Sequence, residues 1–319
     1  MYHRVAKLDT DIWSMSVTPK HFAEHLEVIR EYGYPLHLQE LRNKMVNCQP
    51  IQRQIVITFD DGYADNLYNA KPLLEKFDIP ATVFVTSSVM EQETELWWDD
   101  LEKILLLPVT LPNFLQLEVQ GKNYQWELGE SANYNTNNQM QYNRWRFLKE
   151  PEENPTRRHK LYRAIYWLLR NLSANERNQI INDLHIWAGS DPVQRKTHHT
   201  LTKEELIMLV EGGLIEIGAH TVTHPFLSEY PLGFQRDEII HSKVYLEGIL
   251  NRDINSFAYP YGDYNAETVS LVKALGFNCA CSCEFARVKS NSDLFLLPRI
   301  AVEDWDGDTF AKWLLKSAF

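Results

Sequence analysis

Strand-like and helix-like runs alternate through residues 1–95 of this 319-residue chain and resume after residue 200. The apolar run 55–59 is followed by a helical pattern at 64–77, and a second apolar run, 80–86, comes next. Short apolar runs bounded by turn residues are typical of buried strands. Strands that alternate with helices indicate parallel βα units, so we predict an α/β fold, a distorted parallel (β/α)7-type barrel.

The remaining elements of the barrel follow from the same patterns. We expect a first strand that ends at Val5 and a capping box, Thr202-x-x-Glu205, that opens a helix ending at Gly212. Further strands are expected at 214–219, 256–259 and 279–283, and further helices at 21–32, 38–44, 234–250, 266–275 and 309–316.

Residues 96–200 break the alternation. We treat the chain as one domain, 1–319, with a mostly helical insertion at 96–200. Within it we expect helices at 97–106, at 157–172 and from the Ser173-x-x-Glu176 box to about Gly189, a hairpin at 115–126 and a loop at 131–142. Trp97 and Trp98 could stack on sugars, but burial within the insertion is the favoured interpretation.

Composition limits the possible partners. A hydrophobic content of 44% is that of a folded globular protein. The formal net charge is −11 and there is no long basic run, so nucleic acids and anionic membrane surfaces are not expected partners. No apolar run reaches 18 residues and no signal-peptide pattern opens the chain, so we expect no membrane span and a cytoplasmic location; an exported form stays open if the N-terminus is truncated.

Three of the four cysteines alternate along one strand-like stretch. Cys279, Cys281 and Cys283 would share a face of that strand. Their spacing is not that of a zinc finger, so we expect buried thiols.

Adjacent carboxylates follow the strand at 55–59. Residues 58–63 read Thr-Phe-Asp-Asp-Gly-Tyr, which places Asp60 and Asp61 at the carboxyl end of a strand, where α/β folds carry their chemistry. Because consecutive strand residues point in opposite directions, one aspartate can face a metal while the other faces water or substrate. A simple strand-exit turn explains this motif alone equally well.

A pair of histidines follows the strand at 214–219. His220 and His224 are four residues apart, which would put them on one face of a helical turn and suits two nitrogen ligands of one ion. Eleven histidines give roughly 0.4 such pairs by chance, so the spacing alone is weak. With one aspartate, the pair forms a facial set that leaves positions open for water and substrate.

A third motif, Phe-Ala-Tyr-Pro-Tyr-Gly at 257–262, is a short aromatic strand that ends in a turn. A backbone N–H in such a turn can donate to a developing oxyanion. An ordinary strand exit is the alternative.

In this order, the three motifs resemble those of the polysaccharide deacetylase family (carbohydrate esterase family 4). Residues 2–5 (Tyr-His-Arg-Val), 17–22 (Val-Thr-Pro-Lys-His-Phe) and 297–300 (Leu-Pro-Arg-Ile) resemble segments of its extracellular-polysaccharide branch. The resemblance covers about 1–95 and 200–319. It implies that Asp61, His220 and His224 hold a divalent metal, usually zinc and sometimes cobalt or nickel. Asp60 would be the general base toward metal-bound water, and the Tyr261 N–H would stabilise the oxyanion.

The chain departs from the family pattern in two places. Many members carry an arginine where this chain has Ala258, and Arg299 is our candidate to steady Asp60 in its place. Many members have a late histidine that protonates the leaving amine, but no histidine follows His241. His3 is the first candidate for this acid; direct proton return from Asp60 is the alternative.

The resemblance implies a metal-dependent hydrolase that removes N-acetyl groups from an amino-sugar-containing glycan, acting on carbon–nitrogen bonds other than peptide bonds. The same barrel could act on a small amide or on a nucleotide- or lipid-linked sugar. A carbohydrate-binding relative without turnover is a third possibility, although binding alone needs no Asp60. The sequence carries no signal for an oligomeric state.

Overall fold

The computed structural model describes residues 1–88, 90, 95–134, 145–147 and 154–317. They form two compact units. Unit 1 comprises Met1–Lys7, Met15–Glu93 and His199–Phe319, and unit 2 comprises Leu8–Ser14 and Thr94–His198. Unit 2 contains most of the predicted insertion and also an early segment that the sequence analysis did not single out. The assignment of the chain to one catalytic domain with an insertion stays a prediction.

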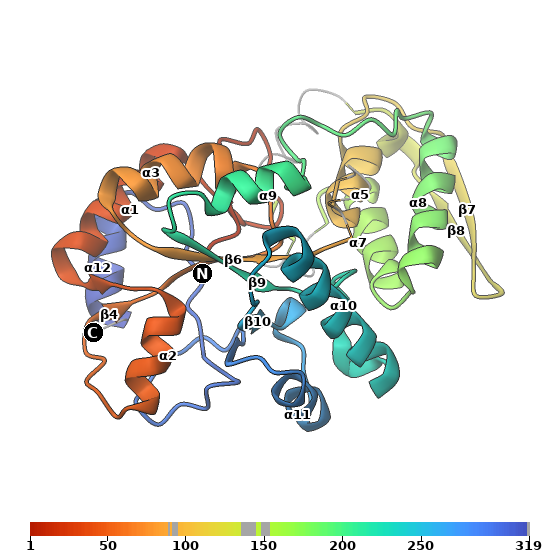
Figure 1. The fold of residues 1–319 in the computed structure, drawn as a ribbon. Coiled ribbons are helices and arrows are strands. Elements are labelled where there is room, and N and C mark those ends of the chain that lie inside the picture. Colours follow the sequence, from red (N-terminus) through yellow and green to blue (C-terminus); the bar gives the residue numbers. More distant parts are fainter. Residues whose placement is uncertain (89, 91–94, 135–144, 148–153, 318–319) are drawn as a thin grey trace. The chain divides into compact units, whose positions relative to one another are not determined.

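The centre of unit 1 is a curled, all-parallel sheet with the strand order β11–β10–β9–β6–β5 (Figure 1). Its strands are β5 (Ile57–Phe59), β6 (Ala81–Val85), β9 (Ile215–Ala219), β10 (Ser256–Ala258) and β11 (Cys279–Cys281). Parallel bridges join Phe59 to Tyr2 and Cys281 to Leu297, so the curve continues past both edges of the sheet. The predicted α/β fold with a distorted parallel barrel is confirmed.

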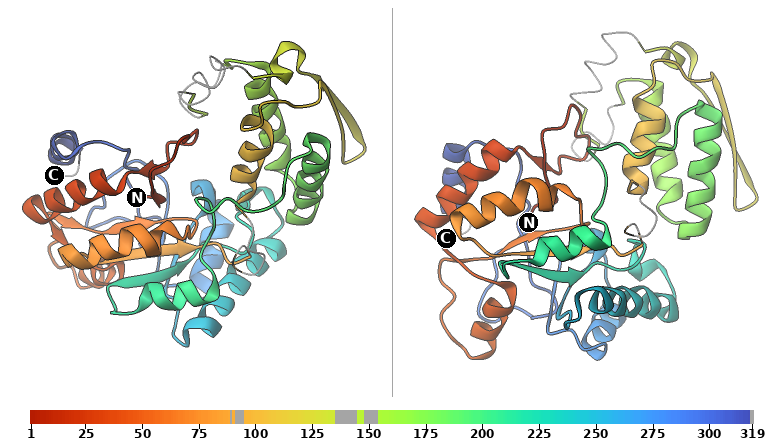
Figure 2. Two further views of the ribbon diagram at one scale, coloured as in Figure 1. Left: turned by 90° about the horizontal axis from the view of Figure 1, so that it is seen from above. Right: turned by 45° about the horizontal axis from the view of Figure 1, so that its top comes forward.

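Two short parallel pairs and a set of helices complete unit 1. The pairs are β1 (Arg4–Val5) with β2 (Ser16–Val17) and β3 (Tyr34–Pro35) with β4 (Gln54–Ile55). The helices are α1 (Pro19–Tyr32), α2 (Leu38–Val46), α3 (Lys71–Phe77), α9 (Lys203–Val210), α10 (Leu232–Leu250), α11 (Ala266–Ala274) and α12 (Gly307–Ser317). Short helical turns are η3 (Leu227–Glu229) and η4 (Pro260–Gly262). Figures 1 and 2 show α1, α3 and α9 along the outside of the curled sheet.

The helix predicted at 64–77 is interrupted. It consists of a π-helical turn, η1 (Asn66–Ala70), followed by α3. Side chains at the start of η1 contact the first strand. Asp65, just before η1, accepts from the Val5 N–H at 3.0 Å, and Asn66 Nδ2 donates to the His3 carbonyl at 2.9 Å. A π-helical turn is often found near functional sites.

Strand alternation separates two hydrophobic clusters. Outward-facing residues such as Val83 and Phe257 pack in the larger cluster with the surrounding helices. Inward-facing residues such as Phe84 and Ala258 form a smaller cluster with side chains of α2. The ring of Phe84 requires Gly218 beside it, because a Cβ at residue 218 would lie 2.4 Å from the ring.

The described residues of unit 2 include three helices, a hairpin and a short turn. These are α5 (Trp97–Leu106), α7 (Arg157–Leu169), α8 (Ala174–Ala188), the antiparallel pair β7 (Phe114–Val119) and β8 (Lys122–Glu127), and η2 (Gly129–Ala132). The predicted helices and hairpin are confirmed, and most of the loop predicted at 131–142 lies outside the described residues. Trp97 and Trp98 are buried, which agrees with the interpretation favoured from the sequence.

The cysteine prediction is only partly right. Cys279 and Cys281 are buried on β11, but Cys283 is exposed because the strand ends at Cys281 and the chain turns away. The three thiols therefore do not share one strand face.

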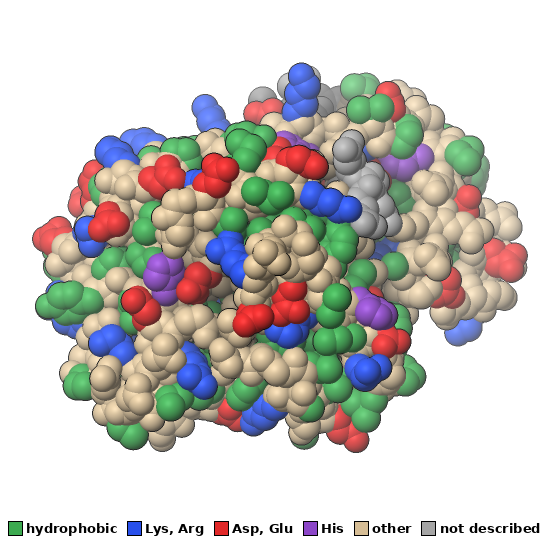
Figure 3. Space-filling view, in the orientation of Figure 1, with side chains coloured by type: hydrophobic (Ala, Val, Ile, Leu, Met, Phe, Trp, Pro, Cys, Tyr) green, Lys and Arg blue, Asp and Glu red, His purple; other side chains and the backbone are tan. Residues whose placement is uncertain are grey.

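The surface and helices of the described residues give two further facts. On the face shown in Figure 3, acidic and basic side chains are interspersed, and neither sign dominates. Over the described ranges, every helix is too short or too polar to cross a lipid bilayer.

Candidate metal centre

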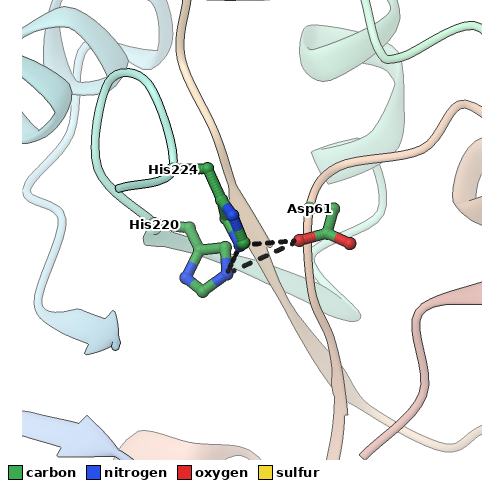
Figure 4. A group of neighbouring side chains, drawn as sticks. All are labelled: Asp61, His220 and His224. Atoms are coloured by element: carbon green, nitrogen blue, oxygen red, sulfur yellow. Dashed lines mark hydrogen bonds and ion pairs between the residues drawn. The ribbon is translucent and has the colours of Figure 1, made fainter. Parts of the chain in front are cut away.

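Two imidazoles and one carboxylate meet at the carboxyl-terminal edge of the sheet. Asp61 follows β5, whereas His220 and His224 follow β9. The three side chains point toward one another (Figure 4). Asp61 Oδ1 lies 3.6 Å from His220 Nε2 and 3.3 Å from His224 Nε2, and the two Nε2 atoms are 3.1 Å apart. All three residues are buried, and together they form a candidate site for a divalent metal.

The two imidazoles converge through a strained loop. The prediction that they lie on one face of a helical turn is wrong, because residues 220–224 are not helical. Thr221 has φ 65° and His224 has φ 56°, a left-handed conformation that a β-branched residue seldom adopts. Such strain persists only where the surrounding structure holds it, and it clusters at functional sites.

The two aspartates also diverge through a turn. β5 ends at Phe59, and Asp61 has φ 73°. The divergence therefore arises from this turn and not from strand alternation, as the sequence analysis assumed. Gly62 continues the turn with φ 83°, and a Cβ there would lie 3.0 Å from Val85 Cγ1. Glycine is the residue that adopts this conformation without a side-chain penalty.

The geometry of the three ligand atoms fits a divalent ion. Donor atoms bound to a tetrahedral zinc at about 2.0–2.1 Å lie about 3.3 Å apart, close to the separations of 3.1, 3.3 and 3.6 Å. His220 Nδ1 lies 2.8 Å from the Ala258 carbonyl, which only accepts, so Nδ1 carries the proton. The Nε2 of the neutral ring then directs a lone pair toward the Asp61 carboxylate. A cation between these atoms removes their repulsion, and the Nδ1–H bond fixes the ring as ligating histidines require.

A second carboxylate lies beside this group and pairs with an arginine. Asp60 Oδ1 accepts from Arg299 Nη1 at 2.6 Å, and Oδ2 accepts from Nη2 at 2.7 Å. Arg299 also donates from Nη1 to Thr58 Oγ1 at 3.2 Å and from Nε to the Ser282 carbonyl at 3.0 Å. Asp60 and Arg299 are buried, so the ion pair is shielded from water.

Both aspartates are ionised. Burial acts to raise the pKa of Asp60, but the charge of Arg299, the nearby His220 and the arginine hydrogen bonds outweigh it and lower the pKa. Burial likewise opposes ionisation of Asp61, but its interactions with the His220 and His224 rings outweigh burial and bring its pKa well below the ordinary value. The site therefore presents two carboxylates in different roles: one faces the imidazoles and the other faces an arginine.

His3 lies close to both aspartates. It stands between the bridge at Tyr2 and β1, and it is partly exposed. An electrostatic interaction with His3 is the smallest of the causes that lower the pKa values of Asp60 and Asp61. The chain beside His3 contacts the end of β5, because the Asp60 N–H donates to the Tyr2 carbonyl at 3.1 Å. The role of His3 as the acid stays a prediction.

The turn at 260–262 also reaches the imidazoles. Tyr261 has φ 58° within η4, and its ring contacts the His224 ring with centroids 4.4 Å apart. Phe226 stacks on this tyrosine, at 3.9 Å between centroids and 4° between planes. Phe226 was not among the predicted site residues, although its position two residues after His224 was an available signal.

Unit 2 contains another group of potential ligands, Asp99, Glu102 and His198, all buried. This group already has a cation nearby: Arg195 Nη1 lies 3.4 Å from Glu102 Oε2, and Arg195 also pairs with Glu95 at 2.7 Å. Because a guanidinium pairs with Glu102, the group differs from the Asp61 site, where no arginine or lysine pairs with the carboxylate within the part of the chain that the structure describes.

Comparison with known proteins agrees with this site. Residues 48–113 and 160–280, more than half of the chain, match the family described as "Polysaccharide deacetylase". The chain belongs to the polysaccharide deacetylase family. It is 26% identical over 136 residues to YxkH of Bacillus subtilis (strain 168), which carries the name of a polysaccharide deacetylase. That match spans 41% of this chain and 47% of YxkH, less than half of either.

Solved structures share the fold of this deacetylase-family chain. The Streptococcus pyogenes deacetylase PplD in complex with acetate has a TM-score of 0.59 at 19% identity, over 99% of this chain and 95% of PplD. IcaB from Ammonifex degensii has a TM-score of 0.55 at 17% identity, over 98% of this chain and 94% of IcaB. At these identities the likeness establishes the fold alone.

The structure forms two groups from residues that the family resemblance singled out. Asp61, His220 and His224 converge, and Arg299 reaches Asp60 from beyond β11. Ala258, which stands where many members of the polysaccharide deacetylase family carry an arginine, contributes its carbonyl to His220. The catalytic roles of these residues remain predictions.

Proposed function

We propose that this chain is a metal-dependent N-deacetylase of an amino-sugar-containing glycan. The observation that carries the proposal is a buried pair of imidazoles with Asp61, next to an ionised Asp60 that Arg299 holds in place. Family membership supports hydrolysis of an acyl group, and PplD, a deacetylase, has been solved with acetate.

We expect the metal to be zinc. Two imidazoles and a carboxylate are a frequent catalytic zinc set, and cobalt or nickel can use the same donors. When bound, the ion lowers the pKa of water toward about 7 and polarises the acyl oxygen. His220 and His224 would hold it through Nε2, and Asp61 would hold it through Oδ1.

Asp60 accepts the proton of the attacking water. Arg299 uses one lone pair on each carboxylate oxygen, and each oxygen keeps another for this proton. The same arginine fixes the direction of the carboxylate. It also lowers the pKa of Asp60, so the base is ionised at neutral pH although it is weaker than an ordinary carboxylate.

Two further residues complete the proposal. The Tyr261 N–H would donate to the oxyanion, because the positive φ of this residue sets the direction of its peptide beside His224. His3 would give a proton to the leaving amine, because it follows Tyr2, whose carbonyl accepts from the Asp60 N–H at 3.1 Å. Direct transfer from protonated Asp60 to the amine is the alternative.

Two other functions share this site. The barrel could hydrolyse a small amide or a nucleotide- or lipid-linked sugar, or it could bind carbohydrate without turnover. The Asp60–Arg299 pair favours an enzyme, because a binding protein needs no positioned base.

Acetate release from N-acetylated chito-oligomers tests the proposal. The zinc-loaded chain should release acetate, and Asp60→Asn should lower the rate by at least about a hundredfold while zinc stays bound. Asp78→Asn is the matched control: Asp78 caps α3 before β6, at the opposite end of that strand, and asparagine tolerates its φ of 50°.

Each outcome separates the candidates. No acetate from any acetylated sugar, together with retained zinc and glycan binding, would point to the binding protein. Full turnover by Asp60→Asn would show that Asp60 is not the base.

A further inference from the structure

The loop that carries both imidazoles depends on its surroundings for its shape. Residues 220–224 contain two left-handed residues, Thr221 and His224. A threonine in this conformation is unfavourable in isolation, so the loop would relax without external contacts. Relaxation would change the separation of the two Nε2 atoms.

One buried carboxylate contacts the middle of this loop. Glu238 on α10 is 6% exposed. Its Oε2 accepts from the backbone N–H groups of Val222, at 2.9 Å, and Thr223, at 2.8 Å. Its Oε1 accepts from Thr223 Oγ1 at 2.8 Å. Hydrogen bonds to an ionised acceptor are stronger than neutral ones, and consecutive N–H groups form a natural anion-binding concavity.

The other contacts of the loop come mainly from backbone groups. Ser87 N donates to the Thr221 carbonyl at 3.1 Å, and Ser88 N donates to the Val222 carbonyl at 2.9 Å. Thr221 Oγ1 accepts from the His224 N–H at 3.0 Å. Glu238 thus holds the loop from α10, and it can be changed without altering a metal ligand.

We propose that Glu238 is a positioning residue of the metal centre: its carboxylate holds 222–223 so that His220 and His224 keep the spacing one ion requires. This inference rests on the proposed metal site. Partners that orient ligands from outside the coordination sphere typically change metal affinity or activity by about 10–100-fold when removed.

Three variants isolate this role. Glu238→Ala removes all three hydrogen bonds. Glu238→Gln removes the charge but keeps an oxygen that can accept from both N–H groups. The control, Glu247→Ala, lies on the same helix: Glu247 Oε1 accepts from the Ile254 N–H at 3.0 Å and from Lys243 at 2.7 Å, so it holds a different loop.

The measurement is the zinc dissociation constant of the metal-free full chain, obtained by competition with a chromogenic chelator. Glu238→Ala should bind zinc about 10–100-fold more weakly than wild type, Glu238→Gln within about fivefold, and Glu247→Ala equally well. If Glu238→Ala does not fold, Glu238→Asp takes its place, because the shorter side chain cannot reach both N–H groups.

Outcomes for the inference and for the proposed function differ. If Glu238→Ala binds zinc as tightly as wild type, the role of Glu238 is overturned and the proposed function stands. The same holds for Glu238→Asp where that variant is used because Glu238→Ala does not fold. Equal weakening by Glu247→Ala also overturns it, because the effect would then come from α10 as a whole. A wild-type chain that binds no zinc overturns both proposals.

Discussion

Arg299 and Asp60, 239 residues apart in the chain, form a two-pronged ion pair with N–O distances of 2.6 and 2.7 Å. The planar guanidinium matches the carboxylate, so the pair fixes the direction of Asp60 as well as its charge. Arg299 approaches from beyond β11, next to the parallel bridge between Cys281 and Leu297.

Arg299→Lys should reduce the rate of acetate release by at least about tenfold without loss of zinc, because lysine cannot form both bonds. Arg299 lowers the pKa of Asp60, so its replacement raises that pKa. The acidic limb of the pH–rate profile should therefore move to higher pH. A wild-type rate and an unmoved limb would exclude Arg299 as the residue that steadies the base.

Asp61→Asn should weaken zinc binding by at least about a hundredfold, because the amide removes the charged ligand from a buried site. Asp60→Asn should leave zinc affinity within about threefold of wild type. Elemental analysis after dialysis against limiting zinc measures both. If the two variants lose zinc equally, the assignment of one ligand and one base is wrong.

His25 should make the stability of unit 1 depend on pH. Burial lowers the pKa of His25 from 6.5 to about 4, and its Nε2–H donates to the Trp305 carbonyl at 2.8 Å. Between these pH values only the unfolded chain binds the proton. The contribution of His25 to the free energy of unfolding is therefore complete above pH 6.5 and falls as the pH drops toward 4. The loss is up to about 3 kcal/mol.

Chemical denaturation at several pH values checks this contribution. His25→Gln should be less pH-dependent than wild type between pH 6.5 and 4, whereas substitution of the exposed His241 by Gln should leave the slope unchanged. Identical slopes for wild type and His25→Gln would show that another group carries the effect.

Arg195 should be the main ionic contact of unit 2. It pairs with Glu95 and Glu102, whose side chains are almost fully buried. Arg195→Ala removes the guanidinium from both carboxylates, although Lys103 Nζ stays 3.8 Å from Glu95 Oε1 and Thr10 Oγ1 still donates to Glu102 Oε1 at 3.0 Å. We expect unit 2 to lose up to about 3–5 kcal/mol of stability. Tryptophan fluorescence during urea unfolding can measure this, because Trp97 and Trp98 are buried in unit 2. A loss below about 1 kcal/mol would contradict the expectation.

The sequence predicted the order of the elements well because their apolar patterns are strong. The runs at 80–86 and 214–219 became β6 and β9, and the Ser173 and Thr202 capping boxes both formed. The π-helical turn within 64–77 could not be foreseen, since it depends on contacts of Asp65 and Asn66 with the first strand.

The site was predicted more completely in its residues than in its geometry. The family motifs indicated Asp61, His220 and His224, but spacing suggested a helical turn where the chain forms a strained loop. Left-handed residues such as Thr221 leave no local signal in the sequence, because tertiary contacts stabilise them. Phe226 and Glu238 were missed because their contacts with the site appear only in three dimensions.

An anomalous-difference map from zinc-soaked crystals, collected at the zinc absorption edge, tests the central claim most directly. We predict a peak within about 2.3 Å of Asp61 Oδ1 and of Nε2 of both His220 and His224. Asp60 should stay hydrogen-bonded to Arg299 and lie outside the coordination sphere. A map with no peak at these atoms, or with Asp60 as a ligand in place of Asp61, would contradict the account.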